Sequence, residues 1–579
     1  MDIEDTGDLL NNVITEKTKD KAQKSKKIIA KKKQNDSTNK KNIRIFIKTF
    51  GCSHNASDSE YMAGILSSEG YDIVPSLESS DVTIINSCTV KSPSQAAFLN
   101  TVTKSKSFKK KVIVGGCVPQ AERNLAGLEN CSIVGVSQID KINYIVEKTL
   151  EGNVVRFLEN KSLPSLLLPK IRRNKYIEII PISQGCLGSC TYCKTKQARG
   201  KLISYPIEQI VQACKNAWNN NAKELWITSE DTGVYGRDIG TNLPNLLVEI
   251  LKDIPSDVMI RIGMANPPYI LENVNLMIKV LNHPNVYSFI HIPVQSGSNA
   301  VLDKMLREYT IEEFNFLCDK FIEGVPNITI ATDIICGFPT ETKENFEETL
   351  NLVEKYKFSV INISQFYPRP GTVAAKWKKI DTKEVHNRSK ALSDLFRSYS
   401  HYKHLLNTTQ RVWVHDINEE EKNKEENMMV THNKSYVKIL VPKDEKLYGK
   451  ELIVKITKIC EWHCVGEIID KNPAPIKVNY EEYFKDILRQ KDIMIKNYEN
   501  NLSKFNANIN GDSYSIHDTF NMNKNIKKNN DDENDLRKYK YYFDKNNKRN
   551  IMKYLGIFFI YFGTIFYLVY SILKKFKHL

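Results

Sequence analysis

The chain has 579 residues, which is too long for a single hydrophobic core and predicts about three domains joined by linkers. Its composition, with 41% hydrophobic and 26% charged residues, is that of a globular protein. The net charge of +15 is compatible with an RNA partner but does not indicate one by itself, because eleven Lys lie between Lys17 and Lys41. The twelve Cys are spread along the chain, which excludes a small disulfide-stapled fold and favours a reducing compartment.

Residues 1–42 are a Lys-rich tail without a periodic apolar face, and we expect this tail to be disordered. No secretory signal is expected, because the first sixteen residues are acidic and no apolar run follows them. The tail is interpreted as a solvated arm, with steering of a nucleic acid and targeting as the alternatives.

Residues 43–150 alternate between strand-like and helix-like segments, as the chains of parallel α/β sheets do. We therefore expect an N-terminal parallel α/β domain. The expected strands are Ile43–Phe50, Val82–Asn86 and Val112–Val114, and the expected helices are Ser57–Tyr71 and Ser94–Lys106.

A second α/β region extends over residues 175–407. Helical stretches such as Ile207–Asn219 and Asn345–Tyr356 separate its apolar strands. Six strands with crossover helices predict a partial (β/α)6 barrel with functional residues at the C-terminal ends of the strands. The six expected strands are Ile177–Ile182, Glu224–Thr228, Met259–Ile262, Phe289–Ile292, Thr329–Ile335 and Val360–Ser364.

Residues 408–470 change to a pattern of short strands, and we expect a small antiparallel β-barrel there. The segments RVWVHDI, SYVKILVP and ELIVKITKI carry this pattern. Residues 471–550 are rich in Asn and Lys and are interpreted as a low-complexity linker.

Residues 554–573 (YLGIFFIYFGTIFYLVYSIL) are twenty residues without a charge. As a helix they would span about 30 Å, the thickness of the hydrocarbon core of a bilayer. We expect a single transmembrane helix that acts as a tail anchor, with a buried core helix as the alternative. Basic residues flank both ends, so the orientation stays open.

The motif with the clearest chemistry is Cys186-x₃-Cys190-x₂-Cys193, which directly follows the strand Ile177–Ile182. Three thiolates at this spacing can hold one iron–sulfur cubane and leave a fourth iron without a protein ligand. A structural zinc site usually takes four ligands from the protein, and no fourth Cys or His lies nearby. The motif, with the aromatic Tyr192 before the last Cys, resembles that of the radical S-adenosylmethionine (SAM) superfamily.

A second, dispersed triad consists of Cys52, Cys88 and Cys117. Each follows an expected strand (FIKTFGC, VTIINSC and VIVGGC), and the C-terminal ends of parallel strands meet at one edge of a sheet. These positions are compatible with convergence at one site and also with three separately buried Cys.

The segments TFGCSHNASDSEYMAG, INSCTVKSPSQ and VGGCVPQ resemble the N-terminal domain of the methylthiotransferase family. Four further segments resemble its eukaryotic and archaeal threonylcarbamoyladenosine branch: ITSEDTGVYGRDIG, RIGMANP, HIPVQSGSNAVLDKMLREYT and FYPRPGT. The resemblance covers residues 43–469. It implies two [4Fe–4S] clusters, one held by Cys186, Cys190 and Cys193 and one by Cys52, Cys88 and Cys117. It also implies a TRAM-like RNA-binding barrel at the C-terminal end of this region, and some animal members of the branch carry a membrane anchor.

The same resemblance suggests contacts to SAM. Tyr192 would present its backbone to the adenine, and Glu230, which follows the second barrel strand beside Ser229, would bind the methionine amino group. Arg261 and Gln295 lie at or just after strand ends and are further candidates for SAM binding, with a role as polar barrel-rim residues as the alternative. Asp333 lies on another barrel strand, and Gly337 is interpreted as allowing a close approach to the cofactor.

The resemblance implies that one SAM supplies the radical that activates C2 of adenosine 37 in tRNA. A second SAM supplies the methyl group of the transferred methylthio group, so two equivalents are used per turnover. The base must be splayed out of the anticodon loop to react. The electron donor and the sulfur source are not identified by the sequence. A monomer at the endoplasmic reticulum membrane, with its catalytic domains in the cytosol, is expected.

Three alternatives remain open. The chemistry is shared with enzymes that act on isopentenyladenosine in tRNA and with those that act on an Asp of a ribosomal protein. A membrane-tethered, non-catalytic RNA-binding protein is the third. The remaining Cys are interpreted as small buried hydrophobes, and Cys460-x₃-Cys464 with His463 is only half of a metal motif.

Overall fold

The computed structural model describes residues 42–89, 92–159, 163–416 and 427–476, together with residues 483, 485 and 489. The predicted Lys-rich tail, except for Asn42, and the predicted span 554–573 lie outside these residues. Within the described part of the chain, no helix is both long and apolar enough to cross a bilayer. One residue of the predicted linker, Tyr483, packs against the barrel region, where its hydroxyl donates to Lys279 O (3.1 Å).

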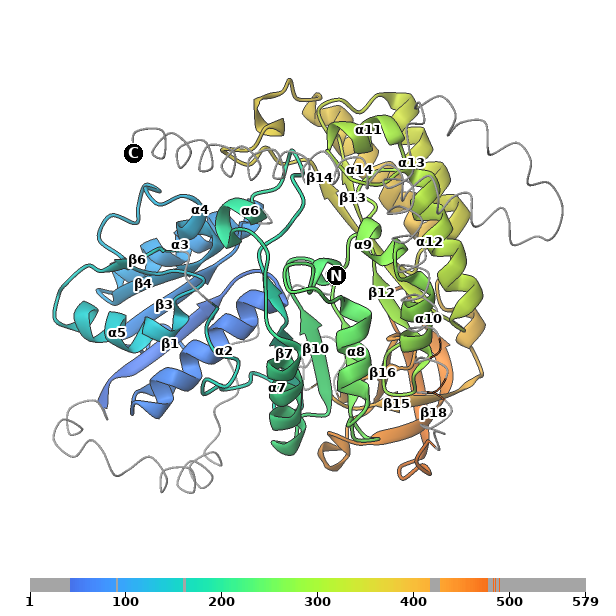
Figure 1. Ribbon diagram of the computed structural model, residues 1–579, viewed down its shortest axis with the longest axis horizontal. Helices are drawn as coiled ribbons and strands as arrows, with labels where there is room; N and C mark the ends of the chain where they lie inside the picture. The colour runs from blue at the N-terminus through green and yellow to red at the C-terminus, as the bar shows by residue number, and fades with distance from the viewer. Residues whose placement is uncertain are drawn as a thin grey trace, which may run out of the picture. The chain divides into compact units, whose positions relative to one another are not determined.

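The N-terminal sheet has six parallel strands in the order β2-β1-β3-β4-β5-β6 (Figure 1). Its core lies on both faces: one cluster packs α2 and α5 against the sheet, and the other packs α3 and α4. The strand order reverses between β1 and β3, the place where open parallel sheets bind ligands beyond the carboxyl ends of their strands. The strands are β1 (Arg44–Thr49), β2 (Asp72–Val74), β3 (Val82–Ser87), β4 (Lys111–Gly116), β5 (Ser132–Val134) and β6 (Arg156–Phe157); the helices are α2 (Ser53–Ser68), α3 (Ser92–Ser107), α4 (Cys117–Ala121) and α5 (Ile142–Leu150).

The second region contains two three-stranded parallel sheets, β11-β10-β7 and β12-β13-β14. A parallel bridge between Ile260 and Val286 joins them, which gives the six parallel strands of the expected open barrel. Its strands are β7 (Ile177–Pro181), β10 (Glu224–Thr228), β11 (Met259–Ile262), β12 (Phe289–His291), β13 (Thr329–Cys336) and β14 (Val360–Gln365). Its helices are α7 (Ile207–Asn219), α8 (Leu243–Leu251), α9 (Pro267–Leu271), α10 (Val274–Asn282), α11 (Asn299–Lys304), α12 (Ile311–Gly324), α13 (Lys343–Tyr356) and α14 (Thr382–Ser398).

A short antiparallel pair, β8 (Ser183–Gln184) with β9 (Ile203–Ser204), encloses the loop that carries Cys186, Cys190 and Cys193, and α6 (Thr195–Arg199) lies inside this loop. The loop is fixed from both sides. Thr191 N donates to Met305 O (3.0 Å), and Ala374 N donates to Thr191 O (2.9 Å).

Five strands between Thr409 and Asp470 form a closed barrel in the order β15-β16-β17-β19-β18. The sequence predicted an antiparallel barrel, and four of its five pairings are antiparallel. The fifth, β17 with β19, is parallel, because a closed ring with an odd number of strands cannot alternate direction all the way round. The strands are β15 (Thr409–Trp413), β16 (Met428–Asn433), β17 (Lys438–Pro442), β18 (Glu451–Ile459) and β19 (Cys464–Asp470).

The small barrel docks onto the start of β10 through the buried carboxylate of Glu224. Trp226 Nε1 (2.6 Å) and Tyr436 Oη (3.3 Å) donate to Glu224 Oε1, and Tyr287 Oη (2.9 Å) donates to Oε2. His415 Nδ1 lies 3.2 Å from the same Oε2. His415 and Tyr436 belong to the small-barrel region, so one carboxylate joins the two barrels at the amino end of the strands, opposite to the end that carries the Cys loop.

Candidate active site

The first Cys triad lies just beyond the carboxyl end of β7, in the loop between β8 and β9. Arg307 Nη1 donates to Cys190 Sγ (3.2 Å), and Cys193 Sγ lies 3.1 Å from Thr195 Oγ1. A Cβ on Gly188 would lie 3.6 Å from Cys186 Sγ and 3.7 Å from Cys190 Sγ, so the backbone turns closely around both sulfurs. The structure therefore brings the predicted triad together.

Burial raises the pKa of the Cys186 thiol above its ordinary value, and the nearby Asp231 raises it further. Burial also raises the pKa of Cys190, although the charge of Arg307 acts in the opposite direction. Without a metal these sulfurs are therefore neutral thiols, and binding of iron would release their protons.

The second triad converges at the reversal point of the N-terminal sheet. Cys52 immediately precedes α2, Cys88 follows β3, and Cys117 begins α4 directly after β4. A Cβ on Gly51, next to Cys52, would lie 2.7 Å from Cys88 Sγ and 3.0 Å from Asn55 Nδ2, and Cys117 Sγ lies 3.8 Å from Asn55 Oδ1, so the three Cys surround the start of α2. Burial raises the pKa of the Cys52 thiol, and the proximity of Cys88 and Cys117 raises it further. Of the two arrangements that the sequence left open, the structure has the convergent one.

No three His, Cys, Asp or Glu side chains among the described residues surround a single metal-ion position. A cluster makes a different demand, because its thiolates bind different iron atoms. Each triad offers three thiols, and in the second triad Gly51 and Gly116 stand where a Cβ would lie less than 3.0 Å from neighbouring atoms. These donor sets fit iron–sulfur clusters.

Glycine is required at Gly116, immediately before Cys117. Its φ is +84°, and a Cβ there would lie 2.3 Å from both Asn86 Oδ1 and Ser87 O. We expect Gly116→Ala to destabilise the N-terminal sheet by about 2–4 kcal/mol, because it adds a clash with backbone to the cost of positive φ. Thermal unfolding and iron content after reconstitution measure the effect. Gly127→Ala is the matched control, since Gly127 also has positive φ (+91°) but no atom lies within 4 Å of its Cβ position; equal effects of the two substitutions would contradict the prediction.

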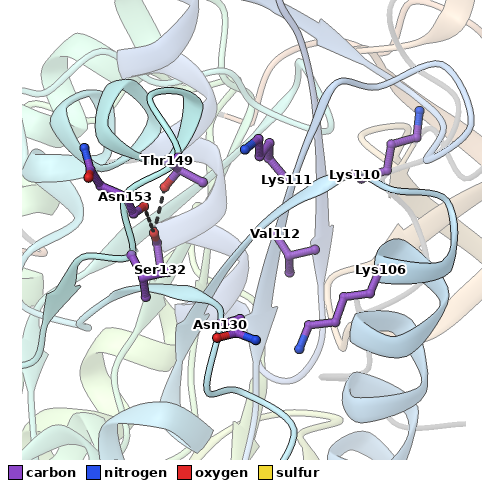
Figure 2. Close-up of a pocket in the computed structure, with 10 residues that line it drawn as sticks. Lys106, Lys110, Lys111, Val112, Asn130, Ser132, Thr149 and Asn153 are labelled. Carbon is purple, nitrogen blue, oxygen red and sulfur yellow. Dashed lines mark hydrogen bonds between the residues drawn. The ribbon is translucent and has the colours of Figure 1, made fainter.

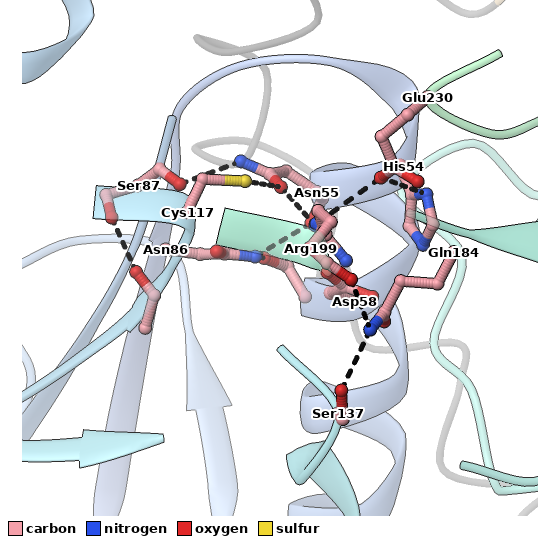
Figure 3. Close-up of polar contacts among 12 residues, drawn as sticks. His54, Asn55, Asp58, Asn86, Ser87, Cys117, Ser137, Gln184, Arg199 and Glu230 are labelled. Carbon is pink, nitrogen blue, oxygen red and sulfur yellow. Dashed lines mark hydrogen bonds and ion pairs between the residues drawn. The ribbon is translucent and has the colours of Figure 1, made fainter. Parts of the chain in front are cut away.

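A buried polar bridge joins Cys117 of the second triad, through Asn55 and Arg199, to Glu230 (Figure 3). Arg199 Nη2 donates to Asn55 Oδ1 (2.6 Å) and to Asp58 Oδ2 (2.7 Å), and Asn55 Oδ1 is also 3.8 Å from Cys117 Sγ. On the other side, Arg199 Nε lies 3.4 Å from Glu230 Oε1. Arg199 thus reaches the second triad through α2 and the barrel through Glu230.

Glu230, predicted to bind SAM, has both carboxylate oxygens engaged in this bridge. Oε2 accepts from Gly185 N (2.9 Å), next to Cys186, and Oε1 lies 2.9 Å from His54 Nδ1. Burial alone would raise the pKa of Glu230, but His54 and Arg199 lower it, so its carboxylate stays charged. The structure gives Glu230 a bridging role that the sequence did not indicate, and its contact with SAM stays a prediction.

The other predicted SAM contacts lie in and around the barrel. The carbonyl of Tyr192 accepts from Arg369 Nη1 (3.1 Å). Gln295 has a left-handed backbone (φ +68°), held by hydrogen bonds of its N to Asp333 O (2.8 Å) and of Ile335 N to its O (3.0 Å). Non-glycine residues in this conformation concentrate at functional sites, so the observation supports the choice of Gln295.

Two further predicted residues have packing explanations. The guanidinium of Arg261 lies 4.9 Å, 5.3 Å and 5.1 Å from the rings of Trp226, Phe289 and Tyr436 respectively, a stacked position at the junction with the small barrel. Gly337 has φ +77°, and its Cβ would lie 2.5 Å from the side chain of Val385 in α14. Helix packing is therefore sufficient to require glycine at this position, and the close approach of a cofactor stays a prediction.

Three arginines of the site were not predicted from the sequence. Arg307 contacts Cys190 Sγ, Arg369 holds the carbonyl of Tyr192, and Arg199 joins the triads. Asp333 Oδ1 lies 3.0 Å from His291 Nε2 and accepts from Asn362 Nδ2 (2.8 Å), which forms a polar set across β12, β13 and β14. Arg307 and Arg369 lie inside quoted segments, and Arg199 lies six residues after Cys193; these positions are the signal that the sequence offered.

A hollow of about 230 Å³ is lined by Lys106, Lys110 and Lys111 (Figure 2). Lys111 and Ser132 in its wall begin β4 and β5, so it opens at the amino edge of the N-terminal sheet. Lys106 donates to the backbone carbonyl of Gly127, and Lys110 donates to those of Glu78 and Ser80. This hollow lies at the opposite edge from the Cys triad and is not part of the site.

Comparisons with known proteins agree with this geometry. A model described as "Uncharacterized protein family UPF0004" matches residues 44–134, and the Radical SAM superfamily model, which implies a [4Fe–4S] cluster and SAM, matches residues 180–353. The threonylcarbamoyladenosine tRNA methylthiotransferase of Xenopus laevis is 50% identical, covering 73% of this chain and 76% of that protein. The Homo sapiens protein of the same name is 49% identical (71% and 72% covered), and a probable one of Pyrococcus horikoshii is 37% identical (74% and 100% covered). The chain belongs to the threonylcarbamoyladenosine tRNA methylthiotransferase family.

Proposed function

We propose that this protein adds a methylthio group to C2 of N6-threonylcarbamoyladenosine at position 37 of tRNA, giving 2-methylthio-N6-threonylcarbamoyladenosine. The observation that carries the proposal is the joining of two Cys triads by one buried bridge, Arg199 with Glu230. A reaction that opens a C–H bond and delivers sulfur needs two such centres close to one substrate. The names of the relatives supply the nucleoside and the tRNA.

The proposal includes two [4Fe–4S] clusters, held by Cys186, Cys190 and Cys193 and by Cys52, Cys88 and Cys117, and two SAM molecules per turnover. When bound, the first cluster with SAM supplies the one-electron chemistry that an unactivated C–H bond requires. The electron donor is a separate molecule, and the source of sulfur is not identified. The chain is proposed to act as a monomer.

The protein's own residues hold this chemistry in place. Arg307 donates to Cys190 Sγ, and its Nη2 also donates to Asn266 Oδ1, so it fixes the Cys loop against the segment after β11. Asp231 accepts from Asn266 N (3.0 Å) and orders the same segment. Arg369 holds Tyr192 from the segment after β14. These contacts tie the Cys loop to the segments that follow β11 and β14, so the loop is held in one position at the carboxyl end of the barrel.

The small barrel at residues 408–470 is proposed to bind the tRNA backbone, as RNA-binding barrels of this size do. Adenosine 37 would be splayed from the anticodon loop into the carboxyl end of the large barrel. The domains bounded as 43–150, 175–407 and 408–470, with 471–550 as a linker, are the working units of this proposal.

The test uses the full chain, purified anaerobically in detergent and reconstituted with iron and sulfide. The protein is incubated with SAM, a reductant and tRNA carrying threonylcarbamoyladenosine, and the digested nucleosides are analysed by mass spectrometry. The expected product carries a methylthio group in place of hydrogen at C2. Modification of isopentenyladenosine tRNA alone would move the substrate to the related branch, and absence of SAM cleavage from a fully loaded preparation would overturn the catalytic proposal.

Residues 554–573 are proposed to anchor the chain in the endoplasmic reticulum membrane with the catalytic domains in the cytosol. The proposal rests on the uncharged length of the segment. We expect the full chain to resist extraction from microsomes by alkaline carbonate, and Ile560→Lys with Phe566→Lys to release it, because charges near the bilayer centre oppose insertion. Equal extraction of both proteins would contradict the anchor.

A further inference from the structure

Arg199 is the most deeply buried cation beside the second triad, with a side-chain exposure of only 1%. It comes from α6, at the end of the first Cys loop, and it is held by Asn55 and Asp58 of α2. The two acceptors fix the planar guanidinium in one orientation. The bridge therefore places a permanent positive charge beside the sulfurs of a triad that belongs to a different sheet.

Two donor atoms of this guanidinium, Nε and Nη1, are buried and have no hydrogen-bond partner among the described residues. Nε has only the 3.4 Å ion-pair contact with Glu230. A buried donor left unsatisfied costs about 1–3 kcal/mol, so proteins rarely bury one without an acceptor. An acceptor that is bound in the working protein would remove this cost.

Sulfur of the second triad can accept from these donors. Asn55 Oδ1 accepts from Arg199 Nη2 (2.6 Å) and lies 3.8 Å from Cys117 Sγ, so a single side-chain atom separates the guanidinium from this sulfur. A fixed cation at this place favours negative charge at the triad.

We propose that Arg199 is a positioning residue for the second cluster: it donates to sulfur at the Cys52–Cys88–Cys117 triad, and its charge raises the reduction potential of the cluster bound there. This inference rests on the proposed function, in which that triad holds a cluster. Reduction adds one electron to a cluster that already carries three thiolates, and a fixed positive charge with N–H donors stabilises the added negative charge. The residue then links the electronic state of the sulfur-delivering centre to the docking of the barrel.

The test measures this potential directly. In the full chain with Cys186, Cys190 and Cys193 all replaced by Ala, only the second triad is left to bind about four irons, the content of one cluster. The cluster is titrated with dithionite and followed by electron paramagnetic resonance. We expect Arg199→Met to shift the midpoint potential to a more negative value. Arg199→Lys should shift it less, because an ammonium keeps the positive charge near Asp58 but lacks the planar set of N–H donors of the guanidinium.

Lys170→Met is the matched control. Lys170 is a buried cation that crosses the same junction, but its ammonium pairs with Glu60 of α2 (3.3 Å) and Glu178 of β7 (2.6 Å) instead of contacting the triad. We expect this variant to lose thermal stability and to keep the potential. If Arg199→Met fails to fold, the shift in Arg199→Lys decides the question.

The outcomes separate the two proposals. A background protein that binds no iron would overturn the second cluster itself and with it this inference. Full iron content with an unchanged potential in both Arg199 variants would overturn the role of Arg199 and leave the proposed function intact. An equal shift in Lys170→Met would also overturn it, because a loosened junction would then explain the change.

Discussion

Replacing Cys190 with Ala is expected to abolish both SAM cleavage and tRNA modification, whereas replacing Cys88 with Ala is expected to abolish only the modification. The two triads lie on different elements, the loop between β8 and β9 and the edge of the N-terminal sheet. A Cys of one triad can therefore be replaced without changing the backbone that carries the other triad. The loss in each case should be at least about a thousand-fold, since the uncatalysed reaction offers no comparable route.

The measurement follows two products in the same reaction: 5′-deoxyadenosine for SAM cleavage and the methylthio nucleoside for transfer. Cys214→Ala and Cys318→Ala serve as controls, because these Cys are buried in α7 and α12, away from both triads. We expect both controls to keep near-normal activity with a small loss of stability from the cavity. Formation of the methylthio nucleoside by Cys88→Ala would contradict the assignment of the second triad.

The sequence predicted the barrel strands closely where they are short apolar runs bounded by helices. β10 and β11 have the predicted bounds, as does α7, and the other barrel strands differ by one residue at an end. Most of their residues are buried, so short apolar runs mark them, although the residues of β14 are only partly buried or exposed. In the N-terminal sheet, α2 begins at Ser53 instead of Ser57, because its first turn carries the polar residues that bind Arg199 and Glu230.

The small barrel was harder to predict. β16 and β19 were missed, since β16 ends in the polar run Thr431–Asn433 and β19 is interrupted by Gly466 and Glu467. The parallel pairing of β17 with β19 follows from closure, which no local pattern reports. The family itself, by contrast, was predicted from the Cys motifs and is confirmed by relatives that match most of the chain.

The polar bridge shows what sequence reasoning could not reach. Arg199 and Asp58 are 141 residues apart, and His54 meets Glu230 only because α2 packs on β7. Glu230 was selected for its position after a strand, which is a local signal. Its actual partners depend on how two separately folded sheets dock, and side chains at such a junction carry no periodic pattern.

Glu224→Gln is expected to lower the free energy of unfolding by about 3 kcal/mol at pH 7. It should also make the free energy of unfolding fall less steeply as the pH is lowered. Burial alone would raise the pKa of Glu224. The hydrogen bond and the charge of His415, together with the hydrogen bond from Trp226, instead lower this pKa to about 2. A carboxylate with a depressed pKa stabilises the fold above its unfolded pKa of about 4.5 and loses this contribution as the pH falls towards 2. The amide of Gln is neutral, and its NH₂ group would face a hydroxyl or indole donor.

Urea unfolding at pH 7 and at several pH values between 4.5 and 2 tests this, followed by tryptophan fluorescence, since Trp226 donates to Glu224 and Trp413 packs edge-on against Tyr287. Glu249→Gln is the control, because Glu249 pairs with Lys252 on an exposed turn of α8 and should change stability by less than about 0.5 kcal/mol. If the free energy of unfolding of Glu224→Gln falls between about pH 4.5 and pH 2 as steeply as that of the wild type, other carboxylates govern the acid sensitivity. If it falls less steeply, one buried carboxylate at the amino end of β10 holds the proposed RNA-binding barrel against the barrel that carries the chemistry.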